Sequence, residues 1–157
     1  MSMFCYQCQE TAKNEGCMKK GVCGKTDETA NLQDLLLHTL KGIFVCHVKL
    51  KELGINREGT GSFLTEALFV TVTNVNFDPE SVKGTIRQGL ALRDELKELL
   101  ASKGGNLDST HDSVTWEWDD ATLDNKAASI GVLATENEDV RSLRELLTYG
   151  LKGVAAY

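Results

Sequence analysis

The chain has 157 residues, of which 41% are hydrophobic and 25% charged, a composition typical of a globular domain and not of a disordered chain. Its net charge is −6 and it has no cluster of Lys and Arg, which argues against binding to nucleic acid. No apolar run approaches the roughly 20 residues of a membrane span, and the N-terminus lacks the pattern of a secretory signal. We therefore expect a cytoplasmic protein without a membrane partner.

The first 26 residues carry four of the five cysteines, Cys5, Cys8, Cys17 and Cys23. This segment has no helical or strand periodicity, and its three glycines permit tight turns. Disulfides are rare in a reducing cytosol, where clustered cysteines more often indicate metal or redox chemistry. Residues 1–26 are therefore predicted to form a metal-binding loop.

Two helices are predicted next along the chain. The first begins at Asp27, with Thr26 or Asp27 as its N-cap, and ends at Gly54, where a left-handed residue commonly closes a helix. The second covers about residues 62–76. The stretch FVTVTNV within it also alternates like a strand. We favour a helix there because no partner strand is apparent elsewhere.

Three further helices complete the predicted fold. The third helix begins at Pro79, is capped by Asp78 and ends at a pair of glycines. A polar connector follows, with a short helix near 121–128. A last helix, capped by Thr135 or Asn137, continues to the end of the chain. These elements predict an all-α protein.

The last helix repeats a pattern of the first. The stretch LQDLLLHTLKGIF at 32–44 resembles LRELLTYGLKGVA at 143–155, with a constant offset between the matching leucines and the shared LKG. Leucine-rich amphipathic helices often look alike, so one interpretation is coincidence. The other is a duplicated bundle, in which 27–105 form a three-helix bundle and 106–157 form a connector and the first helix of a second, truncated bundle.

The apolar face of that last helix would then lack its partner helices. Exposed apolar stripes of this kind drive association. We therefore expect a homo-oligomer or a domain-swapped dimer of this chain.

The spacing of the four cysteines is two, eight and five residues. Thiolates are soft donors that suit iron–sulfur clusters and zinc. Lys19, Lys20 and Lys25 would offset part of the negative charge of such a site. Zinc ribbons usually show two C-x2-C steps, and this chain has one. The pattern favours iron–sulfur mildly and leaves a structural or interaction module, stabilised by zinc on the four cysteines, as the alternative. Four structural thiols or two disulfides are a third interpretation.

Other residues that could carry chemistry have simpler interpretations. Cys46 lies in the middle of the first helix and is expected to be a small buried apolar residue. His38 and His111 are expected to face solvent. Trp116 and Trp118 are expected to lie over the edge of the core.

Two long segments resemble a known family. FCYQCQETAKNEGCMKKGVCGKTDETANLQDLL at 4–36 is similar to the N-terminus of the hybrid-cluster proteins, also called prismane proteins or hydroxylamine reductases, and GVLATENEDVRSLRELLTYGLKGVAAY at 131–157 is similar to a second block of that family. The resemblance is looser over 55–125. It implies that Cys5, Cys8, Cys17 and Cys23 are the ligands of a [4Fe–4S] cluster. It also implies a first domain built from two helical bundles.

The resemblance further implies a function for the parent protein. The family reduces hydroxylamine to ammonia and water with two electrons, and nitric oxide reduction has also been proposed for it. That chemistry belongs to a second, hybrid iron–sulfur–oxygen cluster bound by His, Glu and several Cys of later domains. No cysteine follows Cys46 here, and only His111 follows His47. We therefore expect no catalytic residue in this chain, which would accept electrons from an external donor and pass them on.

Overall fold

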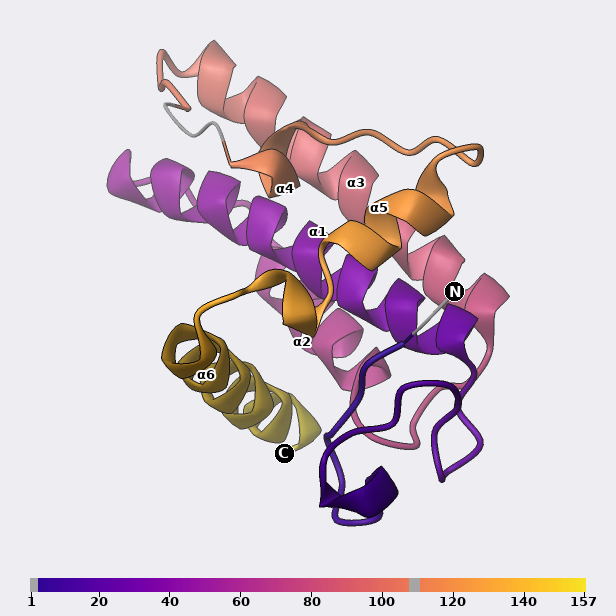
Figure 1. Ribbon diagram of the computed structural model, residues 1–157. Coiled ribbons are helices and arrows are strands. Elements are labelled where there is room, and N and C mark those ends of the chain that lie inside the picture. The colour runs from indigo at the N-terminus through magenta and orange to yellow at the C-terminus, as the bar shows by residue number, and fades with distance from the viewer. Residues whose placement is uncertain (1–2, 108–110) are drawn as a thin grey trace.

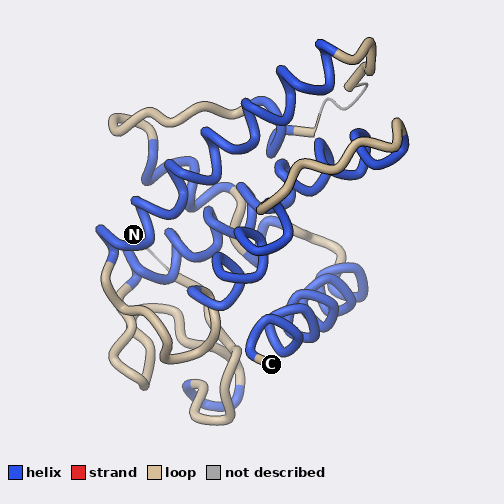
Figure 2. The backbone as a smooth tube through the Cα atoms, turned by 180° about the vertical axis from the view of Figure 1, so that it is seen from behind, coloured by secondary structure: helices blue, strands red, loops and turns tan. Residues whose placement is uncertain are grey.

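The computed structural model describes residues 3–107 and 111–157, and within these the protein is helical (Figures 1 and 2). Residues 1–2 of the predicted loop and 108–110 of the predicted connector lie outside the described residues. The all-α prediction is confirmed. The elements in chain order are η1 (Ala12–Asn14), α1 (Asp27–Glu52), α2 (Thr60–Val70), α3 (Pro79–Ser102), α4 (Asp112–Thr115), α5 (Leu123–Ser129), η2 (Val132–Ala134) and α6 (Glu138–Ala156).

The boundaries of α1 follow from its sequence as predicted. The Thr26 hydroxyl accepts a hydrogen bond from the Thr29 amide, which supplies one of the partners that a helix N-terminus lacks. Asp27 and Glu28 place negative charge in the first turn, where the helix dipole favours it. At the other end Gly54 has φ +73°, a left-handed conformation that glycine adopts without strain.

Helix α2 is shorter than predicted. It ends at Val70, and the expected continuation to residue 76 is wrong. Residues 71–75 form turns in which Asn74 has φ +64°, and β-branched Thr71, Val72 and Thr73 have weak helix propensity. The Thr71 carbonyl, freed by this early end, accepts a hydrogen bond from Lys152.

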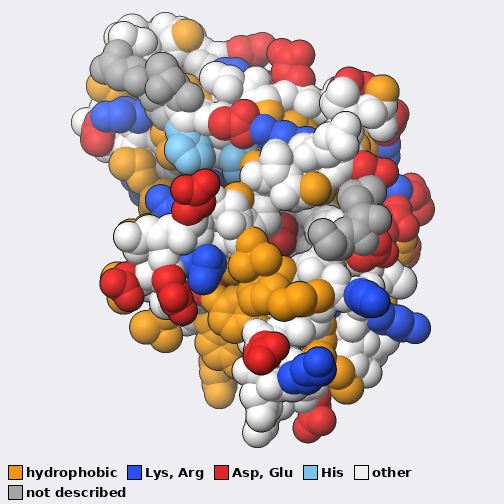
Figure 3. Space-filling view, viewed as in Figure 1, with side chains coloured by type: hydrophobic (Ala, Val, Ile, Leu, Met, Phe, Trp, Pro, Cys, Tyr) orange, Lys and Arg blue, Asp and Glu red, His pale blue; other side chains and the backbone are white. Residues whose placement is uncertain are grey.

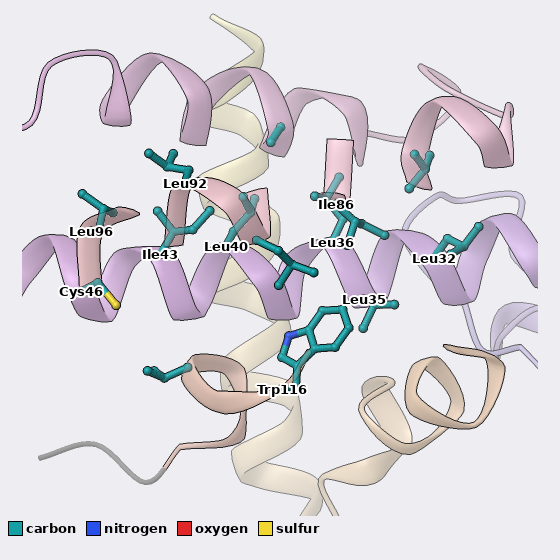
Figure 4. Packing of buried hydrophobic residues seen from close by; sticks show 14 of the residues in the cluster. Leu32, Leu35, Leu36, Leu40, Ile43, Cys46, Ile86, Leu92, Leu96 and Trp116 are labelled. Atoms are coloured by element: carbon teal, nitrogen blue, oxygen red, sulfur yellow. The ribbon is translucent and has the colours of Figure 1, made fainter. Parts of the chain in front are cut away.

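The core lies between α1 and α3. Leu36 and Ile43 of α1 lie beside Ile86 and Leu96 of α3, and all four are removed from solvent (Figure 4). Burial of each such side chain contributes about 1.5–3 kcal/mol to the free energy of unfolding. Leu35 lies on the side of Trp116 (Figure 4). Cys46 is fully buried within this cluster, as predicted.

The connector holds a short helix, α4, that the sequence did not predict. The buried guanidinium of Arg93 donates hydrogen bonds to the carbonyl oxygens of Ser113 (3.3 Å) and Trp116 (2.7 Å). Trp116 is buried against the core, and Trp118 is half-buried beside it. Helix α1 can pass this segment closely because position 42 is glycine: a Cβ there would overlap the Ser113 carbonyl group.

The expectation for His38 was wrong, whereas His111 is exposed as expected. His38 is only 7% exposed because α4 covers it, and its Nε2 lies 2.8 Å from the Asp112 carboxylate, which Lys126 also contacts. Burial lowers the pKa of His38 to about 4, although the hydrogen bond to Asp112 opposes this shift. His38 is therefore neutral at physiological pH.

Helix α6 exposes the leucines whose counterparts α1 buries. The repeated leucines Leu32, Leu35, Leu36 and Leu40 of α1 are at most 5% exposed, whereas their counterparts Leu143, Leu146, Leu147 and Leu151 of α6 are 47–70% exposed. Figure 3 shows a broad hydrophobic patch on the face of the molecule that carries α6. The buried residue of α6 is instead Lys152.

Among the described residues, the search for a helix with the length and hydropathy of a membrane span found none.

Replacing Gly42 with Ala tests the close approach of α1 and α4. We expect Gly42→Ala to lower the free energy of unfolding by about 1–3 kcal/mol, because backbone atoms must move to admit the methyl group. The matched control is Gly84→Ala in α3, where the added methyl group meets open space and raises stability by roughly 0.5–1 kcal/mol. Urea unfolding followed by circular dichroism measures both. Equal effects of the two substitutions would contradict the packing described.

The buried His38 predicts a specific pH dependence. The pKa of His38 is lower in the folded protein than the unfolded value of 6.5. The unfolded chain therefore binds a proton first as the pH falls. The contribution of neutral His38 to stability is complete above pH 6.5 and is lost as the pH falls towards 4. Relative to His38→Gln, the wild type should lose on the order of 2 kcal/mol over this interval. Urea unfolding of both proteins at a series of pH values measures the difference. Parallel pH profiles would show that His38 does not titrate in this way.

Candidate metal centre

The loop before α1 is held in shape by pairing between two of its cysteines. Cys5 and Cys17 exchange two backbone hydrogen bonds, with N···O distances of 3.1 and 2.7 Å, and the Met3 amide donates to the Met18 carbonyl. Met3 and Cys17 are buried against Ala30 in the first turn of α1. The loop is therefore anchored to the N-terminal end of α1, at the lower right of Figure 1.

Cys8 and Cys23 lie in two turns that flank this pair. The Thr11 amide donates to the Cys8 carbonyl (3.2 Å), and the Gly24 amide donates to the Gly21 carbonyl (2.9 Å). A Cβ at position 21 would lie 3.0 Å from the Cys23 sulfur, so glycine leaves room for that thiol. Cys8 is half-buried and Cys23 is exposed.

The surroundings of Cys17 favour its thiolate. A backbone hydrogen bond from Ala12 lowers the pKa of the Cys17 thiol most, burial opposes it, and a backbone hydrogen bond from Val22 and the charge of Lys25 lower it further. The Thr11 hydroxyl lies 3.8 Å from the Cys17 sulfur and donates to the Cys5 carbonyl. Thiolate is the form that binds metal, so these donors prepare the sulfur for a ligand role.

The four cysteines have the chemistry of iron–sulfur ligands and belong to one loop. All are free thiols. Within residues 3–107 and 111–157 no group of three or more His, Cys, Asp or Glu side chains is arranged to hold a metal ion. A [4Fe–4S] cluster binds each sulfur through a different iron, so its ligands need not converge on one point. The ligand set Cys5, Cys8, Cys17 and Cys23 stays a prediction.

Two lysines beside the loop are buried, and only one of them was among the residues expected there. Lys19 and Lys20 are exposed, whereas Lys25 is 3% exposed. The second is Lys152 of α6, which is 4% exposed. Its only signal in the sequence is the LKG shared with the first helix, where the matching Lys41 is exposed.

A groove of about 430 Å³ separates the loop from α6. Tyr6 and Cys8 line one side, and Glu145 and Tyr149 line the other. Partial burial raises the pKa of Tyr6, and the negative charge of Glu145 adds to this. Cys8 borders an open groove between the loop and α6. Figure 2 shows the same loop beside the C-terminal end of α6 from behind.

Comparison with known proteins places the chain in a family. Residues 3–157 match the Prismane/CO dehydrogenase family. Relatives named hydroxylamine reductase from Desulfitobacterium hafniense strain DSM 10664 and Thermoanaerobacter pseudethanolicus are 58% and 53% identical over the whole chain, and that of Nitratidesulfovibrio vulgaris is 52% identical over 99% of it. The chain spans 29% of the length of each of these relatives. It belongs to the Prismane/CO dehydrogenase family.

Proposed function

We propose that this chain is the electron-transfer module of a hydroxylamine reductase and binds one [4Fe–4S] cluster through Cys5, Cys8, Cys17 and Cys23. The observation that carries the proposal is the anchored loop, in which paired Cys5 and Cys17 lie at the N-terminal end of α1 and backbone hydrogen bonds lower the pKa of the Cys17 thiol. The relatives' name supplies the parent activity, the reduction of hydroxylamine.

The residues of the loop have separate tasks in this proposal. When bound, the cluster supplies one-electron oxidation and reduction. Met3 and Cys17 exclude water on the side of α1. Exposed Cys23 and the groove at Cys8 leave two sides open to an external electron donor.

In this proposal, the catalytic residues lie outside this chain. The described residues place no cysteine near the loop beyond the four, because Cys46 lies in the core between α1 and α3. The hybrid cluster and the residues that bind hydroxylamine would belong to other parts of the parent protein. We also propose the division into a cluster-binding loop (1–26), a three-helix bundle (27–105) and a connector with the first helix of a second bundle (106–157).

Substitution of the cysteines tests the ligand set. The wild-type chain, purified without oxygen, should contain four irons and four sulfides per chain and give an EPR signal after reduction with dithionite. Serine in place of Cys5, Cys8, Cys17 or Cys23 should lower iron content several-fold, because a hydroxyl is a poor ligand for iron in a cluster. Cys46→Ala is the control and should keep full iron content.

Two results would contradict the proposal. One zinc per chain without sulfide would favour the zinc-stabilised module. Iron content that falls equally in Cys46→Ala and in the loop variants would show general unfolding and no specific ligand role.

The association expected from the last helix also stays a proposal, and the exposed leucines of α6 support it. We expect light scattering to give a mass above that of the monomer at high concentration. Leu146→Glu should restore the monomer, because it places a charge in the apolar face. Phe44→Glu, at an exposed position of α1, should leave the association intact. A monomeric wild type at high concentration would refute the expectation.

A further inference from the structure

Helix α6 turns a polar stripe towards the protein. Arg141, Glu145, Thr148 and Lys152 recur at helical spacing and are less exposed than the leucines between them. Apolar residues normally occupy the inner stripe of a surface helix. The reversed pattern indicates that the surface beneath α6 requires polar and charged groups.

Lys152 enters this surface behind the cysteine loop. Its ammonium donates a hydrogen bond to the Thr71 carbonyl (3.1 Å), one of the groups freed where α2 ends early. Two residues further on, Thr73 contacts the Gln7 side chain at 3.5 Å, between Cys5 and Cys8 of the loop. The buried cation is therefore held on the turn that touches the loop.

Lys25 is a second buried cation at the same loop. Its ammonium donates to the Gln33 side-chain oxygen at 2.7 Å, a neutral partner. Gln33 in turn donates to the Asn76 carbonyl (3.0 Å), in the same segment between α2 and α3 that holds Lys152. Neither lysine donates to a carboxylate in these bonds, and the acidic group of Asp34 acts on both of them through its charge.

The acidic groups beneath α6 do not balance these charges fully. Burial raises the pKa of Asp34 to about 7, despite the opposing charge of Lys152, and burial also raises the pKa of Glu145. Asp34 is thus partly neutral near pH 7. Burial lowers the pKa of Lys152 to about 8, which still leaves it charged at neutral pH, and Asp34, Glu145 and Cys5 favour that charge. A buried cation costs several kcal/mol unless an anion lies near it.

We propose that Lys25 and Lys152 are buried counter-cations of the thiolate-bound iron–sulfur centre and raise its reduction potential. The proposal rests on the cluster assigned under the proposed function. A thiolate-ligated cluster carries negative charge, and each added electron increases it. Positive charge fixed in a region of low dielectric stabilises the reduced state more than the same charge in water.

The potential of the cluster tests this inference. In the chain purified without oxygen, a redox titration followed by EPR should show a more negative midpoint for Lys152→Met. We expect about a tenfold smaller equilibrium constant for reduction, or about 59 mV for a one-electron couple. Lys20→Met is the matched control, since it removes the same charge from an exposed lysine of the loop. Its shift should be much smaller because solvent screens it.

A second variant keeps the test decisive where Lys152→Met does not fold. Lys25→Met removes the other buried cation and should also shift the midpoint to more negative values. A wild-type level of iron with an unshifted midpoint in Lys25→Met overturns the inference and leaves the proposed function standing. Equal shifts in Lys152→Met and Lys20→Met have the same consequence. A wild-type chain that binds no iron overturns the proposed function and this inference with it.

Discussion

Positive charge buried beside the cysteine loop is the physical constraint on which the account of this protein depends. Lys25 and Lys152 come from opposite ends of the chain and are both almost completely removed from solvent. A globular protein rarely buries a lysine without a partner of opposite charge. Asp34 and Glu145 favour the charge of Lys152, and Cys5 of the loop adds to this. Lys25 in turn adds to the backbone hydrogen bonds that lower the pKa of the Cys17 thiol. The two buried cations and the loop sulfurs therefore interact electrostatically.

The segment between α2 and α3 connects the parts that surround the cysteine loop. Its backbone carbonyl groups accept hydrogen bonds from Lys152 at Thr71, from Gln33 at Asn76 and from the Thr29 hydroxyl at Phe77. Because Gln33 and Thr29 belong to the first two turns of α1, this segment joins α6 to the helix that anchors the loop. The core between α1 and α3 then gives this assembly a rigid support.

The sequence predicted the elements that depend on local chemistry. The caps at Thr26 and Asp78 and the glycine at position 54 are short-range signals, and the helices begin and end there as expected. It did not predict interactions between distant segments. The end of α2 at Val70, the burial of His38 under α4 and the inward direction of Lys152 all depend on tertiary contacts. The repeated LKG was visible in the sequence, but the sequence did not reveal that Lys41 is exposed and Lys152 is buried. Of the candidate site, the four cysteines were predicted from spacing and resemblance, whereas the second buried cation required the fold.

The most direct measurement is native mass spectrometry of the chain purified without oxygen. We predict a folded protein whose mass exceeds that of the polypeptide by four irons and four sulfides, in a single step without partial occupancy by zinc. A folded chain that carries one zinc, or no metal at all, would contradict the assignment of the cysteine loop to an iron–sulfur centre.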